Sequence, residues 1–203
     1  MAKEPLHRQG NLRERIAHLA ARIMAEDGID DFGYAKRKAA RQVGAHDARA
    51  MPDNEEIERA LAAYRELYQQ DEHGPLLASL RRSALEVMRS LSRFNPHLVG
   101  PVLSGVAGKH SGIDLHLFAD SGKDFEIYLL NCGIRYKAAQ LRVFVNHAER
   151  LVPVYSFVHQ DTDIRAIVLD NVDLRSPLKT SPAGRAVERA SLGMVEVLVN
   201  GGG

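Results

Sequence analysis

The hydrophobic pattern of this chain changes its period once, near Pro96. Before that proline, apolar residues such as Leu12, Ile16 and Leu19 recur every three or four positions, which is typical of helices that bury one face. After it, short runs rich in Val, Ile, Leu, Tyr and Phe are separated by Gly, Asp, Ser and Asn, which is typical of strands joined by turns. The sequence therefore predicts an α+β chain, in which an N-terminal bundle of helices packs on a domain with a mixed sheet.

Start and stop signals divide both halves into elements. Gly28 and Gly44 are typical of helix C-termini, whereas Pro52 and Pro75 are typical of helix N-termini. We therefore expect helices over about residues 12–27, 31–43, 53–67 and 75–93. In the second half we expect strands over about residues 99–103, 113–118, 140–146, 152–159 and 163–169, and a helix over 123–131. These elements form three regions: a helical region 1–95, an α/β core 96–172, and a linker with a C-terminal helix over about 185–199 in region 173–203.

Composition narrows the classes of function. The 27 basic and 26 acidic side chains nearly cancel, so nucleic acid or an anionic membrane has to be held by a local patch. The single cysteine, Cys132, excludes an intrachain disulfide and a cysteine-cluster zinc site. No apolar run reaches the roughly 20 residues that span a bilayer, and the N-terminus has no signal-peptide pattern. We therefore expect a cytoplasmic protein without a membrane partner.

The segment 103–118, LSGVAGKHSGIDLHLF, carries the most distinctive chemistry. A turn of small residues and a polar loop precede an apolar strand that contains one carboxylate, Asp114. His116, two residues later, projects from the same strand face. A structural reading is also open: an aspartate beside a tight loop often caps a backbone N–H, and GKHSG has the composition of a simple hairpin loop.

This segment and its surroundings resemble the catalytic core of the nucleotidyltransferase-fold superfamily, which includes polymerase beta. In that family a strand ends in a Gly-Ser turn, and after a loop of small residues the next strand begins with S-D-x-D. Ser104 and Gly105 are similar to the turn, and the run Ser111 to Asp114 is similar to the start of the strand. The resemblance covers about residues 99–169. More narrowly, the chain resembles bacterial proteins that carry this fold behind an N-terminal helical segment.

The resemblance implies transfer of a nucleoside monophosphate from a nucleoside triphosphate to a hydroxyl, assisted by Mg or Mn. It implies that Asp114 is the second motif aspartate and a metal ligand. His116, which projects from the same strand face, is a candidate for an added nitrogen ligand. Gly112 stands where the family has its first aspartate. The best candidate for the third carboxylate is Asp163, at the start of the predicted strand 163–169, and Asp170 is the other candidate. Ser104, Gly105, Lys109 and Ser111 are the expected phosphate-binding residues.

An alternative is a catalytically inactive module of this fold that binds RNA or another polyanion. Arg37 and Arg41 lie one turn apart on a predicted helix, and Arg82 and Arg89 share a side of a later one. The structural reading of the first pair is a solvated helix face balanced by acidic residues, namely Asp27, Asp30 and Asp31. A third hypothesis is that the helices make a homodimer contact.

Overall fold

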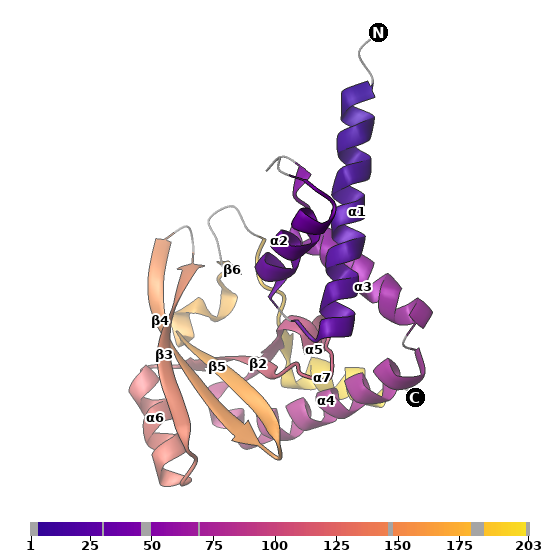
Figure 1. Cartoon of the computed structure of the whole chain (residues 1–203). Coiled ribbons are helices and arrows are strands. Elements are labelled where there is room, and N and C mark those ends of the chain that lie inside the picture. The colour runs from indigo at the N-terminus through magenta and orange to yellow at the C-terminus, as the bar shows by residue number, and fades with distance from the viewer. Residues whose placement is uncertain are drawn as a thin grey trace. The chain divides into compact units, whose positions relative to one another are not determined.

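The structure is a computed structural model, and it describes residues 4–29, 31–45, 50–68, 70–145, 148–179 and 185–201. It divides into two compact units. The first comprises residues 1–76 together with the loop 106–110, and the second comprises residues 77–105 and 111–203. The elements of both are labelled in Figure 1. No helix in the described ranges has both the length and the apolar character needed to span a membrane.

The first unit is helical, as the first half of the sequence predicts. It contains α1 (Glu4–Asp27), α2 (Phe32–Gln42), α3 (Asn54–Tyr68) and the start of α4 (Gln70–Ser90). The core is built on the predicted stripe of α1, where Ile16 and Ala20 are fully buried, and on Ile57 of α3. Many of its other members are alanines, which let the helix backbones approach closely.

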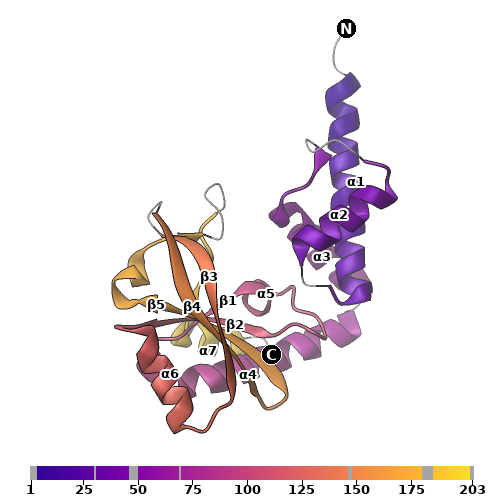
Figure 2. The same cartoon turned by 60° about the vertical axis from the view of Figure 1, so that its left-hand side comes forward.

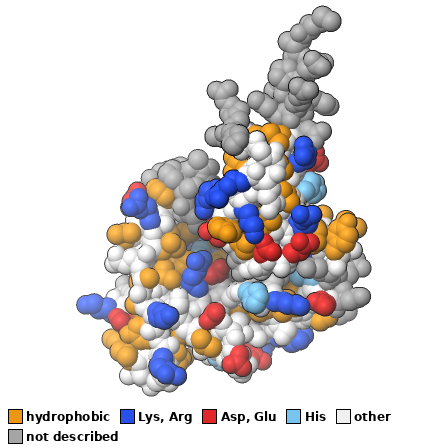
Figure 3. Space-filling model, in the orientation of Figure 1, with side chains coloured by type: hydrophobic (Ala, Val, Ile, Leu, Met, Phe, Trp, Pro, Cys, Tyr) orange, Lys and Arg blue, Asp and Glu red, His pale blue; other side chains and the backbone are white. Residues whose placement is uncertain are grey.

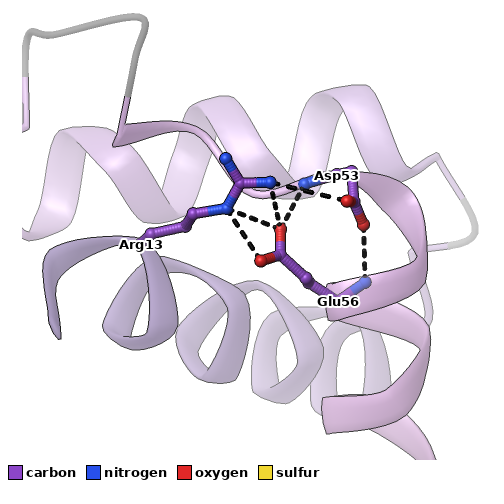
Figure 4. A network of polar contacts seen from close by, with 3 residues as sticks. All are labelled: Arg13, Asp53 and Glu56. Carbon is purple, nitrogen blue, oxygen red and sulfur yellow. Dashed lines mark hydrogen bonds and ion pairs between the residues drawn. The ribbon is translucent and has the colours of Figure 1, made fainter. Parts of the chain in front are cut away.

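An ion-pair network joins α1 to the start of α3 (Figure 4). The Asp53 carboxylate accepts from the Glu56 N–H at 2.8 Å, and the Glu56 carboxylate accepts from the Asp53 N–H at 2.7 Å. This reciprocal pair is a capping box. Arg13 Nε lies 2.7 Å from Glu56 Oε1, so the residue that caps α3 also binds α1. The predicted start of this helix at Asp53 is therefore confirmed within one residue.

The second unit contains the end of α4 and a seven-stranded mixed sheet in the order β6-β3-β4-β5-β2-β1-β7. Its long strands are β2 (Ile113–Ala119), β3 (Tyr136–Val145), β4 (Ala148–His159) and β5 (Thr162–Asp170). β2 and β5 are parallel, and the other neighbours pair antiparallel. Figure 2 shows the twist of the sheet. The short elements are η2 (Ser92–Phe94), β1 (His97–Val99), α5 (Gly100–Ser104), α6 (Gly122–Asn131), η3 (Asn171–Arg175), β6 (Leu178–Lys179), β7 (Ala190–Ser191) and α7 (Leu192–Asn200).

The two faces of this sheet are covered differently. On one face Phe125 of α6 packs against Tyr155 and Phe157 of β4. On the other face Phe118 belongs to a buried cluster that includes Leu178 of β6. That second face also carries Asp114 and His116, because residues two apart on a strand point to the same side.

The α+β class and most predicted elements are confirmed, with three corrections. The strand expected over 99–103 ends at Val99, since Gly100 has φ +69° and Pro101 occupies the first turn of α5. The fourth helix begins at Gln70, so Pro75 lies inside it rather than at its start. The C-terminal helix α7 begins at Leu192 rather than near residue 185, because the residues before it form β7.

Candidate functional site

Asp114 faces an arginine rather than a second carboxylate. It lies on β2 opposite Arg165 of β5, and residues in register on adjacent strands share a face. Arg165 Nε donates to Asp114 Oδ1 at 2.8 Å. The carboxylate side chain is 21% exposed and the guanidinium side chain 54% exposed, so the pair lies at the surface of the sheet. Asp114 therefore has a fixed internal counter-ion.

The turn that approaches Asp114 is at Gly100, not at the predicted Ser104 and Gly105. Gly100 has a positive φ, and a Cβ at this position would lie 2.8 Å from Asp114 Oδ2. The glycine thus permits both the turn after β1 and the close approach of the carboxylate. Ser104 ends α5, and Gly105 caps it with φ +87°. These two residues lie at the opposite end of α5 from the turn that meets Asp114.

The position of the missing first aspartate is sterically closed. A Cβ on Gly112 would lie 2.7 Å from the carbonyl oxygen of Asp163 and 3.4 Å from its Cβ. Asp163 is exposed at the start of β5, so the structure does bring it close to the motif strand. The backbone carbonyl of Asp163 lies in the space that a side chain at position 112 would need.

His116 is buried beside this pair and is neutral. Its exposed fraction is 1%, and its Nδ1 atom has no hydrogen-bond partner within the described ranges. Burial lowers the pKa of the imidazole from 6.5 to about 3, and the positive charge of Arg189, with smaller effects of His97 and Arg165, acts in the same direction. Across the residues described, no group of three or more His, Cys, Asp or Glu side chains is placed to hold a metal ion. Asp114 and His116 thus share a strand face, and within the described residues they are not part of a group of three such ligands.

Two arginines that the sequence analysis did not single out shape this surface. Arg165 pairs with Asp114, and Arg189 lies with its Cζ atom 5.5 Å from the centre of the Phe118 ring. Arg189 Nη2 also donates to the Ser176 carbonyl at 2.6 Å. Arg165 could have been singled out from the sequence, because it is a charged residue inside the apolar run DIRAIVL. No feature of the local sequence indicated a role for Arg189.

Lys109 and Ser111, the other predicted phosphate ligands, fall in different units. Lys109 forms an exposed ion pair with Glu72, with 3.0 Å between Nζ and Oε2. It lines a cavity of about 360 Å³ in the first unit, together with Arg65, His73 and His110. Ser111 is buried in the second unit, which also contains Asp114.

The four predicted polyanion-binding arginines also divide between the units. Arg37 and Arg41 are exposed on α2, and Figure 3 shows basic side chains over this helix. Arg82 is exposed on α4, and Arg89 of the same helix binds Glu196 at 2.9 Å.

Two of the acidic residues expected to balance α2 do contact this helix, at positions other than Arg37 and Arg41. Asp27 binds Lys38 at 2.7 Å, and Asp31 caps α2 by accepting from the Tyr34 N–H at 2.9 Å. Asp30 lies outside the described residues. Neither Arg37 nor Arg41 has an ion pair with any residue that the structure describes. Comparison of the chain with protein-family models, curated proteins and solved structures finds no match.

Proposed function

We propose that this chain is a nucleotidyltransferase-like module without metal-dependent transfer activity, which binds RNA or another polyanion through α2. The order of elements supports the first part. A short strand, β1, is followed by a glycine turn, a short helix and a second strand whose carboxylate lies against that turn. The resemblance implies a strand, a turn of small residues and a second strand that carries the aspartate; the short helix α5 is an addition to that order, and the turn lies at Gly100 rather than at Ser104.

The observation that carries the proposal is the pair between Asp114 and Arg165. The family mechanism uses carboxylates on two neighbouring strands to hold divalent metal ions. Here the neighbouring strand presents a guanidinium, with 2.8 Å between Nε and the Asp114 oxygen. Two unit charges ~4 Å apart near a protein surface interact by about 4 kcal/mol, and a divalent ion doubles that repulsion. Arg165 therefore occupies the Asp114 carboxylate that would otherwise bind a metal ion, and its positive charge opposes metal binding.

Two exposed arginines of α2 support the second part. Arg37 and Arg41 are one helical turn apart, and neither has an ion pair with a described residue, whereas Asp27 pairs with Lys38 of the same helix. Two guanidinium groups at this spacing match adjacent phosphates of a nucleic acid strand. Lys36 lies on the same helix and is half-buried.

The test measures RNA binding and metal-dependent nucleotide binding on the same proteins. Fluorescence anisotropy with a single-stranded RNA, at salt concentrations from about 50 to about 200 mM, gives the slope of log K against log salt. The double variant Arg37→Gln, Arg41→Gln should reduce this slope by about 1.4, because each lost phosphate contact to a single strand is worth about 0.7. Arg142→Gln is a matched control, since Arg142 is exposed and paired with Glu149 at 3.2 Å.

In parallel, wild type and Asp114→Asn are heated with ATP and either Mg²⁺ or Mn²⁺. We expect no shift in melting temperature that requires both the metal and Asp114. Such a shift, or measurable transfer of AMP from ATP to an acceptor, would show instead that the protein is an active nucleotidyltransferase. RNA binding that is unaffected by the double variant would remove α2 from the proposal.

A further inference from the structure

A cavity of about 360 Å³ lies within the first unit, where the C-terminal end of α1 meets α3, the start of α4 and the loop 106–110. Two side chains hold this loop by its backbone. Arg65 donates to the carbonyl of Val106, and His73 Nε2 donates to the carbonyl of Ala107 at 3.0 Å. The volume falls within the range of small-molecule sites, so the cavity has room for a small organic group.

The charges of this cavity balance one another. The charged residues that line it are Glu26, Asp27, Arg65, Glu72 and Lys109. Glu72 pairs with Lys109 at 3.0 Å, and Asp27 pairs with Lys38 of α2 at 2.7 Å. Three carboxylates, two cations and the Lys38 partner of Asp27 sum to zero. This lining favours a neutral ligand that both donates and accepts hydrogen bonds over an anion or a cation.

Aromatic rings lie at the same place. Tyr64 Oη donates to Glu26 of the cavity wall at 2.7 Å. The ring of Tyr68, one turn later on α3, has its centre 4.8 Å from that of Tyr64, and Tyr68 is 72% exposed. His73 and His110 add imidazole rings to the lining. Nucleobases stack on rings of these kinds, and their edges carry both donors and acceptors.

The basic helix α2 adjoins this cavity, because Asp27 of the lining pairs with Lys38. We infer that the cavity binds a nucleobase, with Tyr68 as a stacking surface at its margin. The inference deepens the proposed function and rests on it: Arg37 and Arg41 hold phosphates of a single RNA strand, and the neutral cavity holds one of its bases. A free nucleoside presents the same base, so the experiment has to separate the two sources.

Tyr68→Ala tests the stacking surface by fluorescence anisotropy with a single-stranded RNA. It should weaken binding by about fivefold or more, the usual effect of removing one base–aromatic stack. The slope of log K against log salt should stay unchanged, because this slope reports phosphate contacts. Leu67→Ala is the matched control, since Leu67 is the neighbouring residue and is 75% exposed. Tyr68→Phe keeps the ring and should keep the affinity.

Imidazole C–H signals in ¹H–¹³C NMR spectra test the cavity in the wild-type chain. We expect the single-stranded RNA to shift the His110 signal saturably, whereas an abasic strand of equal length should not, because it has phosphates without bases. His18 is the internal control, since its side chain is 64% exposed on α1 and lies outside the lining. A shift caused by adenosine, cytidine, guanosine or uridine alone identifies a free nucleoside as a sufficient source, and a shift that only RNA causes identifies the strand.

The two proposals fail by different results. If neither RNA nor any nucleoside moves the His110 signal more than that of His18, or if the abasic strand moves it as far as RNA does, the cavity does not bind a base and the inference is wrong. Equal RNA affinities of Tyr68→Ala and Leu67→Ala would likewise exclude the stacking surface. Both results leave intact a salt slope that depends on Arg37 and Arg41, whereas an unchanged slope in that double variant removes α2 alone.

Discussion

Gly112→Ala tests whether the first motif aspartate was lost because its position is closed. The added Cβ would lie 2.7 Å from the Asp163 carbonyl oxygen, a backbone atom of β5. Carbon and oxygen atoms in close contact normally lie at least about 3.3 Å apart, so β5 has to retreat by roughly 0.6 Å. Gly112 has no positive φ, so the cost is steric rather than conformational.

The expected magnitude follows from two opposing effects. Overpacking of this kind costs about 1–3 kcal/mol, whereas replacing a glycine by alanine recovers about 0.4–1 kcal/mol by restricting the unfolded chain. The middles of the two ranges, about 2 and about 0.7 kcal/mol, give a net destabilisation of the sheet of about 1.3 kcal/mol. That corresponds to an approximately tenfold increase in the population of open states.

Amide hydrogen exchange, followed by mass spectrometry of peptides from β2 and β5, measures this opening locally. Gly193→Ala is the matched control, because Gly193 lies in α7 of the same unit with open space around it. That variant should exchange no faster than wild type, since alanine favours a helix. Unchanged or slower exchange at β5 in Gly112→Ala would refute the steric argument, and the loss of the aspartate would then need another reason.

Three further predictions concern charge and capping. Arg165→Glu places a second carboxylate beside Asp114, so Mn²⁺ should raise the melting temperature of this variant and leave that of wild type unchanged; equal responses would contradict the assignment of Arg165. His116 has a folded-state pKa of about 3 against 6.5 when unfolded, so the unfolded state binds more protons between these values. Stability should therefore fall as pH falls through this window, by about 1.4 kcal/mol per pH unit more in wild type than in His116→Asn, as measured by urea unfolding; parallel pH profiles would show that His116 is not buried neutral. Asp53→Ala removes the cap of α3 and should cost about 1 kcal/mol in urea unfolding, whereas Asp53→Ser should keep most of the stability; equal losses would show that the cap is not the cause.

Most elements could be predicted from the sequence because their signals are local. The strand over 113–118 was expected from its apolar run and is observed as β2 (Ile113–Ala119). The exceptions were places where a local signal had two meanings. Val99 to Leu103 has the composition of a strand, but the glycine and proline within it begin a helix. Pro75 indicated a helix start, although α4 already runs through it.

The candidate site could be predicted only in part. Asp114 and His116 were expected on one strand face, and they share it in β2. Asp163 was expected as a third carboxylate. In the structure its backbone oxygen is the group that lies beside Gly112, at the start of the motif strand. The basic helix α2 was expected from four cationic residues, but only the structure shows that Asp27 pairs with Lys38 of this helix, whereas Arg37 and Arg41 have no ion pair with a described residue.

The sequence by itself determined where helices give way to strands, because hydrophobic periodicity is a property of each segment alone. It also determined that one carboxylate lies within a buried strand. Only the tertiary structure decided what that carboxylate meets. Arg165 is 51 positions from Asp114 and reaches it through the parallel register of β2 and β5. Register depends on how whole strands pair across a sheet, so no local pattern around Asp114 contains it.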